Sequence, residues 1–222
     1  MEKLKNFYKP LSAILLIYVC INALLINSPR LNILNETIRS LHFHVPMWFG
    51  MVFLLLISFI YSLLYLKKNK LYFDDNAVAF ANTGVLFGFL GILTGMIWAK
   101  FTWGKFWNGD PKQNGAAITL LIYFSYMILR KNFSDKKQKA KISAIYNIFA
   151  FFALIPLLFI LPRLTDSLHP GSGGNPGFNS YDLDYNLRLV FYPAVIGWFL
   201  LGFWISKLIS YIIYIKRKNK KN

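Results

Sequence analysis

The chain has 222 residues, of which 56% are apolar and 18% aromatic but only 15% charged. Soluble domains carry roughly a quarter charged residues, so this composition argues against a water-soluble globular domain. The net charge of +16 is confined to short clusters between long uncharged runs, which is typical of basic loops on a membrane protein and argues against a nucleic-acid-binding face. The sequence therefore predicts an all-α, polytopic membrane helix bundle. It forms a single integral membrane domain over residues 1–222, with membrane lipid and no nucleic acid as a partner.

Six uncharged runs are long enough to cross about 30 Å of hydrocarbon. The first follows three lysines, as in a signal peptide, but residues 26–30 offer no small-x-small cleavage site, so we interpret it as an uncleaved signal anchor. None of the six carries Asp or Glu, which argues against a proton-driven pump. The six predicted transmembrane helices cover residues 11–26, 45–66, 77–99, 115–129, 143–161 and 189–215.

The basic residues predict the orientation of the bundle. One set of alternating connections, together with both termini, holds seventeen Lys and Arg residues, whereas the other set holds seven. The positive-inside rule then places both termini in the cytoplasm. The loops that face outward are 27–44, 100–114 and 162–188.

All three histidines fall in these outward loops, with His42 and His44 before the second span and His169 before the sixth. A lone loop histidine is most often a solvated surface residue, but here all three share one side of the membrane. Pro46, two residues after His44, indicates a helix start that fixes the position of that histidine. His42 is too close to His44 to be the opposite ligand to one ion, so it is either a surface residue or a group that tunes or replaces His44.

The segment from Trp98 to Asp110 holds three of the six tryptophans: Trp98, Trp103 and Trp107. Taken singly, each tryptophan is typical of an aromatic belt at the membrane interface. The pair Asp110-Pro111 is typical of a helix start, with Asp as the N-cap and Pro as the first helical residue. We therefore expect Asp110 to cap a helix instead of touching a ligand.

Two histidines on separate loops with tryptophans between them indicate a haem site. An apolar ring with iron at its centre needs an aromatic or apolar platform and axial imidazoles from opposite faces. The single cysteine, Cys20, lies in an apolar run and is expected to be buried, and no CxxCH motif is present, so such a haem would be non-covalent haem b. The same parts also suit a quinone site or a substrate gate. Basic residues near enough to pair with the propionates are Arg39, Lys100, Lys105 and Arg163.

Three stretches resemble one protein family. Residues 95–112, GMIWAKFTWGKFWNGDPK, resemble the WWD motif of the CcmC/CcmF/CcsA haem-handling proteins of cytochrome c biogenesis, whose pattern is close to WAxxxWGxxWxWD. Residues 43–48, FHVPMW, resemble the HVP signature before the second span of the haem exporter protein C (CcmC) group. His169 sits where that group has its second external histidine. One departure is Gly109, which stands where the motif commonly has tryptophan and leaves the platform one indole short.

The resemblance implies that His44 and His169 are the axial ligands of the iron. It also implies a multi-pass protein of the bacterial inner (cytoplasmic) membrane, with the haem site on the periplasmic face. Such a protein presents haem for transfer to a haem chaperone (CcmE-like), and an ABC-type export complex (CcmAB-like) acts later. The haem-binding segment would contain Trp98, Trp103, Trp107 and Asp110.

Two other functions stay open. A CcsA-like haem transporter or cytochrome c synthase subunit acts directly on apocytochrome c, but such proteins are usually longer and carry a histidine within a span, which none of the six predicted spans does. The other is a haem-free structural subunit of a transporter. No GxxxxGK[ST] motif is present, so ATP hydrolysis is not expected, and we expect a scaffold for haem transfer more than a catalyst.

The glycine-rich run 171–177 predicts a flexible loop tip beside His169.

Overall fold

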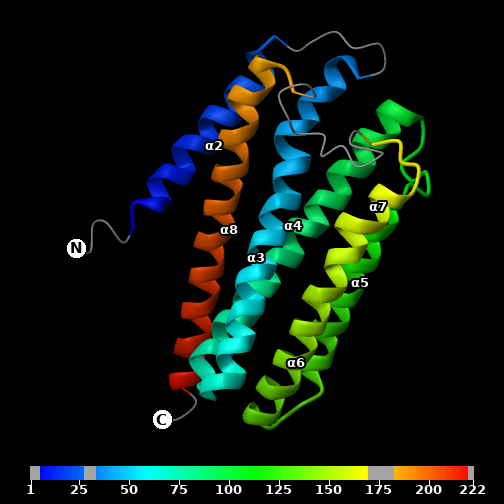
Figure 1. Ribbon diagram of the computed structural model, residues 1–222. Helices are drawn as coiled ribbons and strands as arrows, with labels where there is room; N and C mark the ends of the chain where they lie inside the picture. The colour runs from blue at the N-terminus through cyan, green and yellow to red at the C-terminus, as the bar shows by residue number, and fades with distance from the viewer. Residues whose placement is uncertain (1–5, 28–33, 170–182, 220–222) are drawn as a thin grey trace.

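The computed structural model describes residues 6–27, 34–169 and 183–219 of the chain. Every regular element within these ranges is helical, which confirms the predicted all-α bundle. Figure 1 shows long helices running side by side from one end of the molecule to the other. In chain order the elements are α2 (Tyr8–Leu25), η1 (Asn35–Ser40), α3 (Leu41–Lys68), α4 (Leu71–Trp103), α5 (Pro111–Lys131), α6 (Lys136–Ile155), η2 (Pro156–Ile160), α7 (Leu161–Leu164) and α8 (Tyr185–Asn219).

Five helical segments are long and apolar enough to cross a membrane: Tyr8–Leu25, Glu36–Lys68, Leu71–Trp103, Lys136–Leu164 and Tyr185–Asn219. Helix α5 corresponds to the fourth predicted span and has 21 residues. Its polar first turn and the basic pair at its end lower its hydropathy, because both lie within the helix and not beyond it. The polytopic bundle is thus confirmed, and α5 is its most polar long helix.

The helices extend further than the uncharged runs predicted. An uncharged run marks only the part of a helix that lies in hydrocarbon, and backbone hydrogen bonding continues into the polar residues beside it. Helix α3 begins at Leu41 and α4 ends at Trp103, so the predicted loops 27–44 and 100–114 are wrong at those edges. The loop between α4 and α5 shrinks to residues 104–110. The glycine-rich run 171–177 lies outside the described residues.

Helices α3 and α4 form the antiparallel centre of the bundle and carry its most extensive helix–helix contact. Helices α8 and α2 pack on one side of this pair, and α6 and α5 on the other (Figure 1). Small residues on α4 allow the close approach, because a Cβ on Gly84 would lie 2.8 Å from Leu55 and one on Gly88 would lie 2.5 Å from Met51. The core between the helices is apolar and aromatic, and includes Leu54, Phe80 and Tyr123.

Two carboxylates near the start of α4 join three helices by ion pairs. Asp74 accepts two hydrogen bonds from Arg130 of α5, at 2.7 and 2.9 Å, and Asp75 lies 2.6 Å from Arg217 of α8. The predicted span 77–99 contains no Asp or Glu, but α4 begins earlier, at Leu71, and includes both carboxylates. The expectation that no span carries Asp or Glu is therefore wrong for the whole of α4. Both carboxylates are paired within the protein, as buried charges must be.

Helix α2 contacts mainly α8, so only a narrow stripe of it is buried, at Ser12, Val19 and Ala23. Cys20 lies off this stripe and is exposed. The prediction that it is a buried residue is wrong. In a membrane protein an apolar residue can face lipid as readily as the core, and the sequence does not distinguish the two.

Candidate functional site

Two tryptophans lie in the last turns of α4, at the end of the bundle opposite the start of that helix. Trp98 and Trp103 meet edge to face, with ring centroids 4.7 Å apart. The helix continues through residues 99–103 because they include no glycine or proline, and it ends at Gly104, whose φ of +83° is left-handed. Both residues therefore lie on α4: Trp98 as expected from the predicted span 77–99, and Trp103 in place of the predicted loop 100–114.

Asp110 lies at the start of α5 with its side chain fully buried. Its Oδ1 accepts a hydrogen bond from the backbone N–H of Lys112 at 2.8 Å, and Pro111 is the first helical residue, which confirms the predicted cap. Its Oδ2 accepts from the N–H of Leu168 at 2.7 Å and from the hydroxyl of Ser167 at 2.9 Å. The cap thus ties the start of α5 to the segment that follows α7.

The same carboxylate holds His169. The Nδ1 atom of His169 lies 2.8 Å from Oδ1 of Asp110. The imidazole also packs against Trp103, with ring centroids 4.7 Å apart, and against Trp98 at 5.7 Å. Four of the six predicted site residues therefore meet in one place, and the hydrogen bond between Asp110 and His169 is a contact that the sequence did not predict.

Asp110 is charged in this setting. Burial alone raises the pKa of its carboxyl group. The hydrogen bond and charge of His169 and the backbone N–H groups of Leu168 and Lys112 outweigh the burial, and together they hold the pKa of Asp110 well below its usual value. A permanent carboxylate beside the Nδ1 atom of His169 stabilises the tautomer with its proton on Nδ1.

Close packing of α5 against η2 places this carboxylate beside the chain that leads to His169. A Cβ on Gly115 would lie 2.2 Å from the carbonyl oxygen of Leu157, so only glycine permits the approach. Pro156 ends α6 and begins the wider turns of η2, since a proline has no N–H to continue the helix. Residues 165–169 then follow α7 and reach the start of α5.

His44 lies two turns before Met51 on α3 and faces α4. Its Nδ1 atom is 2.9 Å from the carbonyl oxygen of Gly91 and 3.3 Å from the hydroxyl of Thr94. A Cβ on Gly95 would lie 2.4 Å from the imidazole, so the ring occupies the space above that glycine. Gly95 therefore makes room for the imidazole of His44, and Gly91, four residues earlier, makes room for Trp48. Such a small-xxx-small pattern is visible in the sequence.

His44 and His169 both form their hydrogen bond to the protein through Nδ1. A carbonyl or carboxylate oxygen can only accept a hydrogen bond, so the Nδ1 atoms of His44 and His169 both carry the proton. In the neutral form of each ring, Nε2 is then the unprotonated nitrogen. A pair of neutral imidazoles with free Nε2 atoms fits an iron that takes two axial nitrogens.

His42 does not join this pair. It is fully buried, and within the described residues neither of its ring nitrogens has a hydrogen-bond partner. Residues two apart on a helix point to nearly opposite faces, so His42 faces away from the α4 contact of His44. The interpretation of His42 as a surface residue is wrong, and substitution for His44 is excluded by the same geometry.

Both of these histidines lie inside the apolar segment Glu36–Lys68. The expectation that no span holds a histidine is therefore wrong. The predicted span began at residue 45, whereas the helical segment begins earlier, with η1 and the first turn of α3. This argument no longer separates the two protein types that were weighed from the sequence.

Trp107 stands apart from the other predicted site residues. It lies in the loop 104–110, 39% exposed, and within the described part of the chain its ring does not contact His169 or the two other tryptophans. The neighbouring Gly109 has φ of +71°, and nothing lies within 4 Å of a Cβ built there. A tryptophan would find space at that position but would strain this backbone conformation, which glycine adopts freely.

Two of the four basic residues proposed for propionates are committed elsewhere. Nη1 of Arg39 donates to the carbonyls of Ala23 and Ile26, both at 2.9 Å, and so ties η1 to the end of α2. The ammonium of Lys100 donates to the carbonyl of Gly104. The remaining two, Lys105 and Arg163, are exposed.

A cavity of about 340 Å³ borders the site between η1, α3 and α4. It connects with both halves of the site, because it reaches Thr94, which contacts His44, and Trp98, which contacts His169. Its walls are mostly apolar. The lining residues are Glu36, Thr37, Ser40, Phe43, Thr94, Ile97, Trp98 and Phe101.

The family model and the relatives that match this chain point to the same family. The family model described as "Heme exporter protein C" matches residues 1–220. Cytochrome c biogenesis protein CcsA of Ranunculus macranthus is 40% identical over 76 residues, or 34% of this chain and 23% of that protein. The protein of the same name from Cyanidium caldarium is 36% identical over 67 residues, or 30% of this chain and 21% of that protein. The chain thus matches less than a quarter of the length of these relatives. Because the family model covers nearly the whole chain, the protein belongs to the heme exporter protein C (CcmC) family of cytochrome c biogenesis.

Proposed function

We propose that this protein binds haem b non-covalently through His44 and His169 and presents it for cytochrome c maturation. One observation carries the proposal: the Nδ1–H of His169 is held at 2.8 Å by the buried carboxylate of Asp110. Histidines that bind a metal through one nitrogen almost always donate the other N–H to a carboxylate or a carbonyl. His44, with its Nδ1 atom on the carbonyl of Gly91, has the same arrangement.

Each residue of the site has a defined task. His44 and His169 offer Nε2, and Asp110 fixes the tautomer and the ring orientation of His169. Trp98 and Trp103 hold the imidazole of His169 from two directions and add aromatic surface beside it. When bound, haem supplies an iron with two axial positions and vinyl groups that can react with a partner protein. Trp107, exposed in the loop, is then available to contact the ring edge or the partner.

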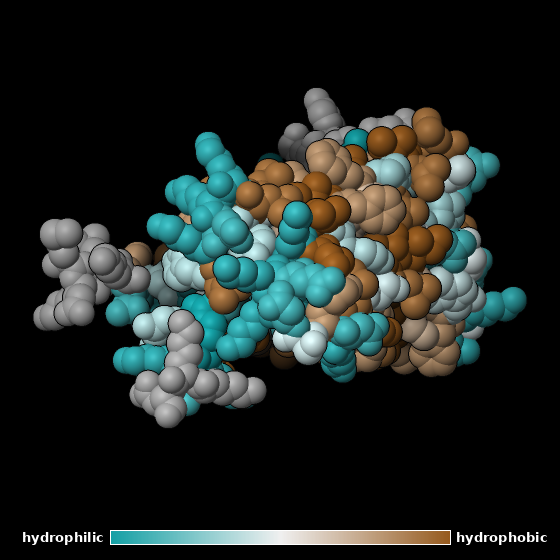
Figure 2. Space-filling view, turned by 90° about the horizontal axis from the view of Figure 1, so that it is seen from below, coloured by the Kyte–Doolittle hydropathy of each residue, from teal (hydrophilic) through white to brown (hydrophobic). Residues whose placement is uncertain are grey.

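The position of the site in the bundle supports a location on the periplasmic face of the bacterial inner membrane. The site lies where α4 ends and α5 begins. At the opposite end, α3, α5 and α8 end and α4 and α6 begin. Figure 2 looks at this end and shows hydrophilic residues gathered on it. We name it the basic end, because the last turns of α3, α5 and α8 are basic. The positive-inside rule assigns such an end to the cytoplasm. Haem held at the other end would be presented to periplasmic partners.

The partners that fit this role are a haem chaperone (CcmE-like) that accepts the haem and an ABC-type export complex (CcmAB-like) that acts on the loaded chaperone. The protein itself then acts as a scaffold, since its site residues bind and orient but none is placed as a nucleophile. The second candidate is a CcsA-like subunit that acts directly on apocytochrome c. The names of the relatives favour it.

Substitution of the two histidines tests haem binding. His44→Ala and His169→Ala should each lower the haem content of the purified protein strongly, and the double variant should show no Soret absorbance. His42→Leu, which fills a buried position on the opposite face of α3, is the matched control and should keep its haem. Full haem retention in the double variant would overturn the proposal.

Co-purification separates the two candidate functions. The tagged full chain should retain a haem chaperone in a haem-dependent manner, and the double histidine variant should not. Retention of apocytochrome c together with a large second membrane subunit, and no chaperone, would favour the CcsA-like function instead.

A further inference from the structure

A cleft opens at the basic end, far from the haem site. It has a volume of about 420 Å³ and lies between the start of α4, the start of α6 and the end of α8. Helices α6 and α8 both pack against α3 and α4, on opposite sides of that pair, so their ends leave room between them. The residues that line it are Leu71, Asp74, Asp75, Lys136, Lys139, Ile213, Lys216, Arg217 and Asn219.

The charges in this cleft do not balance. Asp74 pairs with Arg130 at 2.7 Å and Asp75 with Arg217 at 2.6 Å, so both carboxylates of the cleft are neutralised by arginines. Its three lysines, Lys136, Lys139 and Lys216, form no ion pair with the described residues. The first two also lie in the first turn of α6, where the helix dipole adds positive potential. The cleft therefore attracts an anion.

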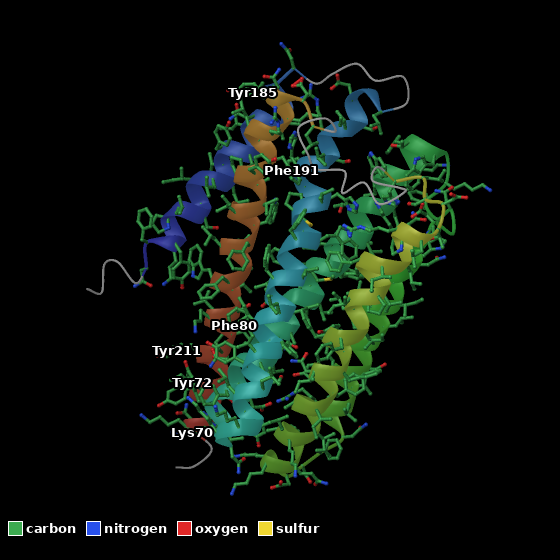
Figure 3. All side chains as sticks on the ribbon, in the orientation of Figure 1. Lys70, Tyr72, Phe80, Tyr185, Phe191 and Tyr211 are labelled. Carbon is green, nitrogen blue, oxygen red and sulfur yellow. The ribbon has the colours of Figure 1, made fainter. Side chains whose placement is uncertain are left out.

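The surroundings of the cleft are those of a membrane interface. Leu71 and Ile213 give it an apolar wall. Tyr72 is 53% exposed and Tyr211 is 64% exposed, and Figure 3 shows both near Lys70 at this end of the molecule. Exposed tyrosines mark the depth of lipid headgroups, where one side of the ring meets hydrocarbon and the hydroxyl meets water. An amphiphile with an anionic head and an apolar tail matches such a site.

We propose that this cleft binds an anionic phospholipid through its phosphate. Lys136, Lys139 and Lys216 contact the headgroup, and the acyl chains leave along the apolar wall toward the exposed side chains of α8, such as Ile212. Basic pockets between membrane helices on the cytoplasmic side bind headgroups of this kind. The Asp–Arg pairs beneath the lysines keep the arginines fixed and leave the lysines for the ligand. A lipid there would join α4, α6 and α8 at the end where they diverge.

The test uses the full chain, purified in detergent and titrated with phosphatidylglycerol or phosphatidylcholine. Native mass spectrometry counts bound lipid, and the unfolding temperature reports its effect on the protein. Wild type should bind phosphatidylglycerol preferentially and be stabilised by it. The triple variant Lys136→Gln, Lys139→Gln and Lys216→Gln should bind it about tenfold or more weakly.

A second triple variant controls for the loss of three charges. Lys137→Gln, Lys141→Gln and Lys218→Gln removes three exposed lysines from the same helix ends but outside the cleft. It should lose less than about threefold in affinity, as expected for screened surface charges. Replacing the three cleft lysines by arginine should preserve binding and shows that these positions tolerate substitution.

Three results would overturn the proposal. The first is an equal loss in the two glutamine variants, which would mean that the lysines act through general surface charge. The second is equal affinity for phosphatidylcholine and phosphatidylglycerol. The third is stabilisation by inorganic phosphate as large as that by phosphatidylglycerol at the same concentration, which would identify a free anion as the ligand.

Discussion

Substitution of Asp110 by asparagine separates its two roles. Asparagine is as good an N-cap as aspartate, so α5 should still begin at Pro111. The carboxylate, however, accepts four hydrogen bonds: from the N–H groups of Lys112 and Leu168, the hydroxyl of Ser167 and the Nδ1–H of His169. An amide oxygen has two lone pairs, so about two of these donors would lose their acceptor.

The size of the effect follows from the contact that is weakened. Loss of the group that orients a metal-binding histidine costs roughly 10- to 100-fold in metal affinity, which is about 1.4 to 2.7 kcal/mol. We therefore expect Asp110→Asn to weaken haem binding by that factor, with the His44 side of the site unchanged. The assay is a titration of the haem-free protein with hemin, followed at the Soret band.

Asp135 provides a matched control. It caps α6 through a hydrogen bond from the N–H of Gln138 at 2.7 Å, it is exposed, and it lies at the basic end. Asp135→Asn makes the same chemical change without touching the haem site and should leave haem affinity unaltered. Equal haem affinity in Asp110→Asn and wild type would refute the reasoning, because the hydrogen bond to His169 would then have no role in binding.

Three further outcomes follow from the same contacts. Gly95→Ala places a methyl 2.4 Å from the imidazole of His44, so it should displace that ring and lower the Soret absorbance; unchanged absorbance would show that the ring has another place to lie. Trp103→Phe should weaken haem binding more than Trp107→Phe in the same titration, because Trp103 contacts His169 and the exposed Trp107 does not. The lowered pKa of Asp110 gives stability that is present above the ordinary carboxyl pKa of about 4 and is lost as the pH falls below it. The difference in unfolding temperature between wild type and Asp110→Asn should thus stay constant from pH 7 to about 5 and shrink below about 4; shrinkage already between pH 7 and 5 would assign the effect to another group.

The order of the long helices could be predicted from hydropathy, because uncharged runs of sufficient length have few alternatives in lipid. Their ends could not. Helix α3 begins four residues before residue 45, and α4 continues to Trp103, since polar residues beside a span can stay helical at the interface. This difference moved His44 and Trp103 from predicted loops to helices. The start of α5 was predictable, because Asp110-Pro111 encodes a local signal that needs no tertiary contact.

The tertiary contacts of the site could not be predicted from the sequence. The hydrogen bond between Asp110 and His169 joins residues 59 apart, and it depends on Gly115 allowing α5 to approach η2. Burial of His42 likewise depends on which face of α3 meets its neighbours, and a span that is apolar nearly all round gives no periodicity to indicate it. Gly91 and Gly95 are visible in the sequence as a small-residue pattern, but their partners, Trp48 and His44, are not.

The central claim is that one iron is bound by Nε2 of both His44 and His169. Electron paramagnetic resonance of the purified ferric protein tests it most directly, because two axial imidazoles give a low-spin iron. We predict a low-spin signal for wild type and for His42→Leu, and conversion to a high-spin signal or loss of haem in His44→Ala and in His169→Ala. A low-spin signal of wild-type intensity in both alanine variants would contradict the account.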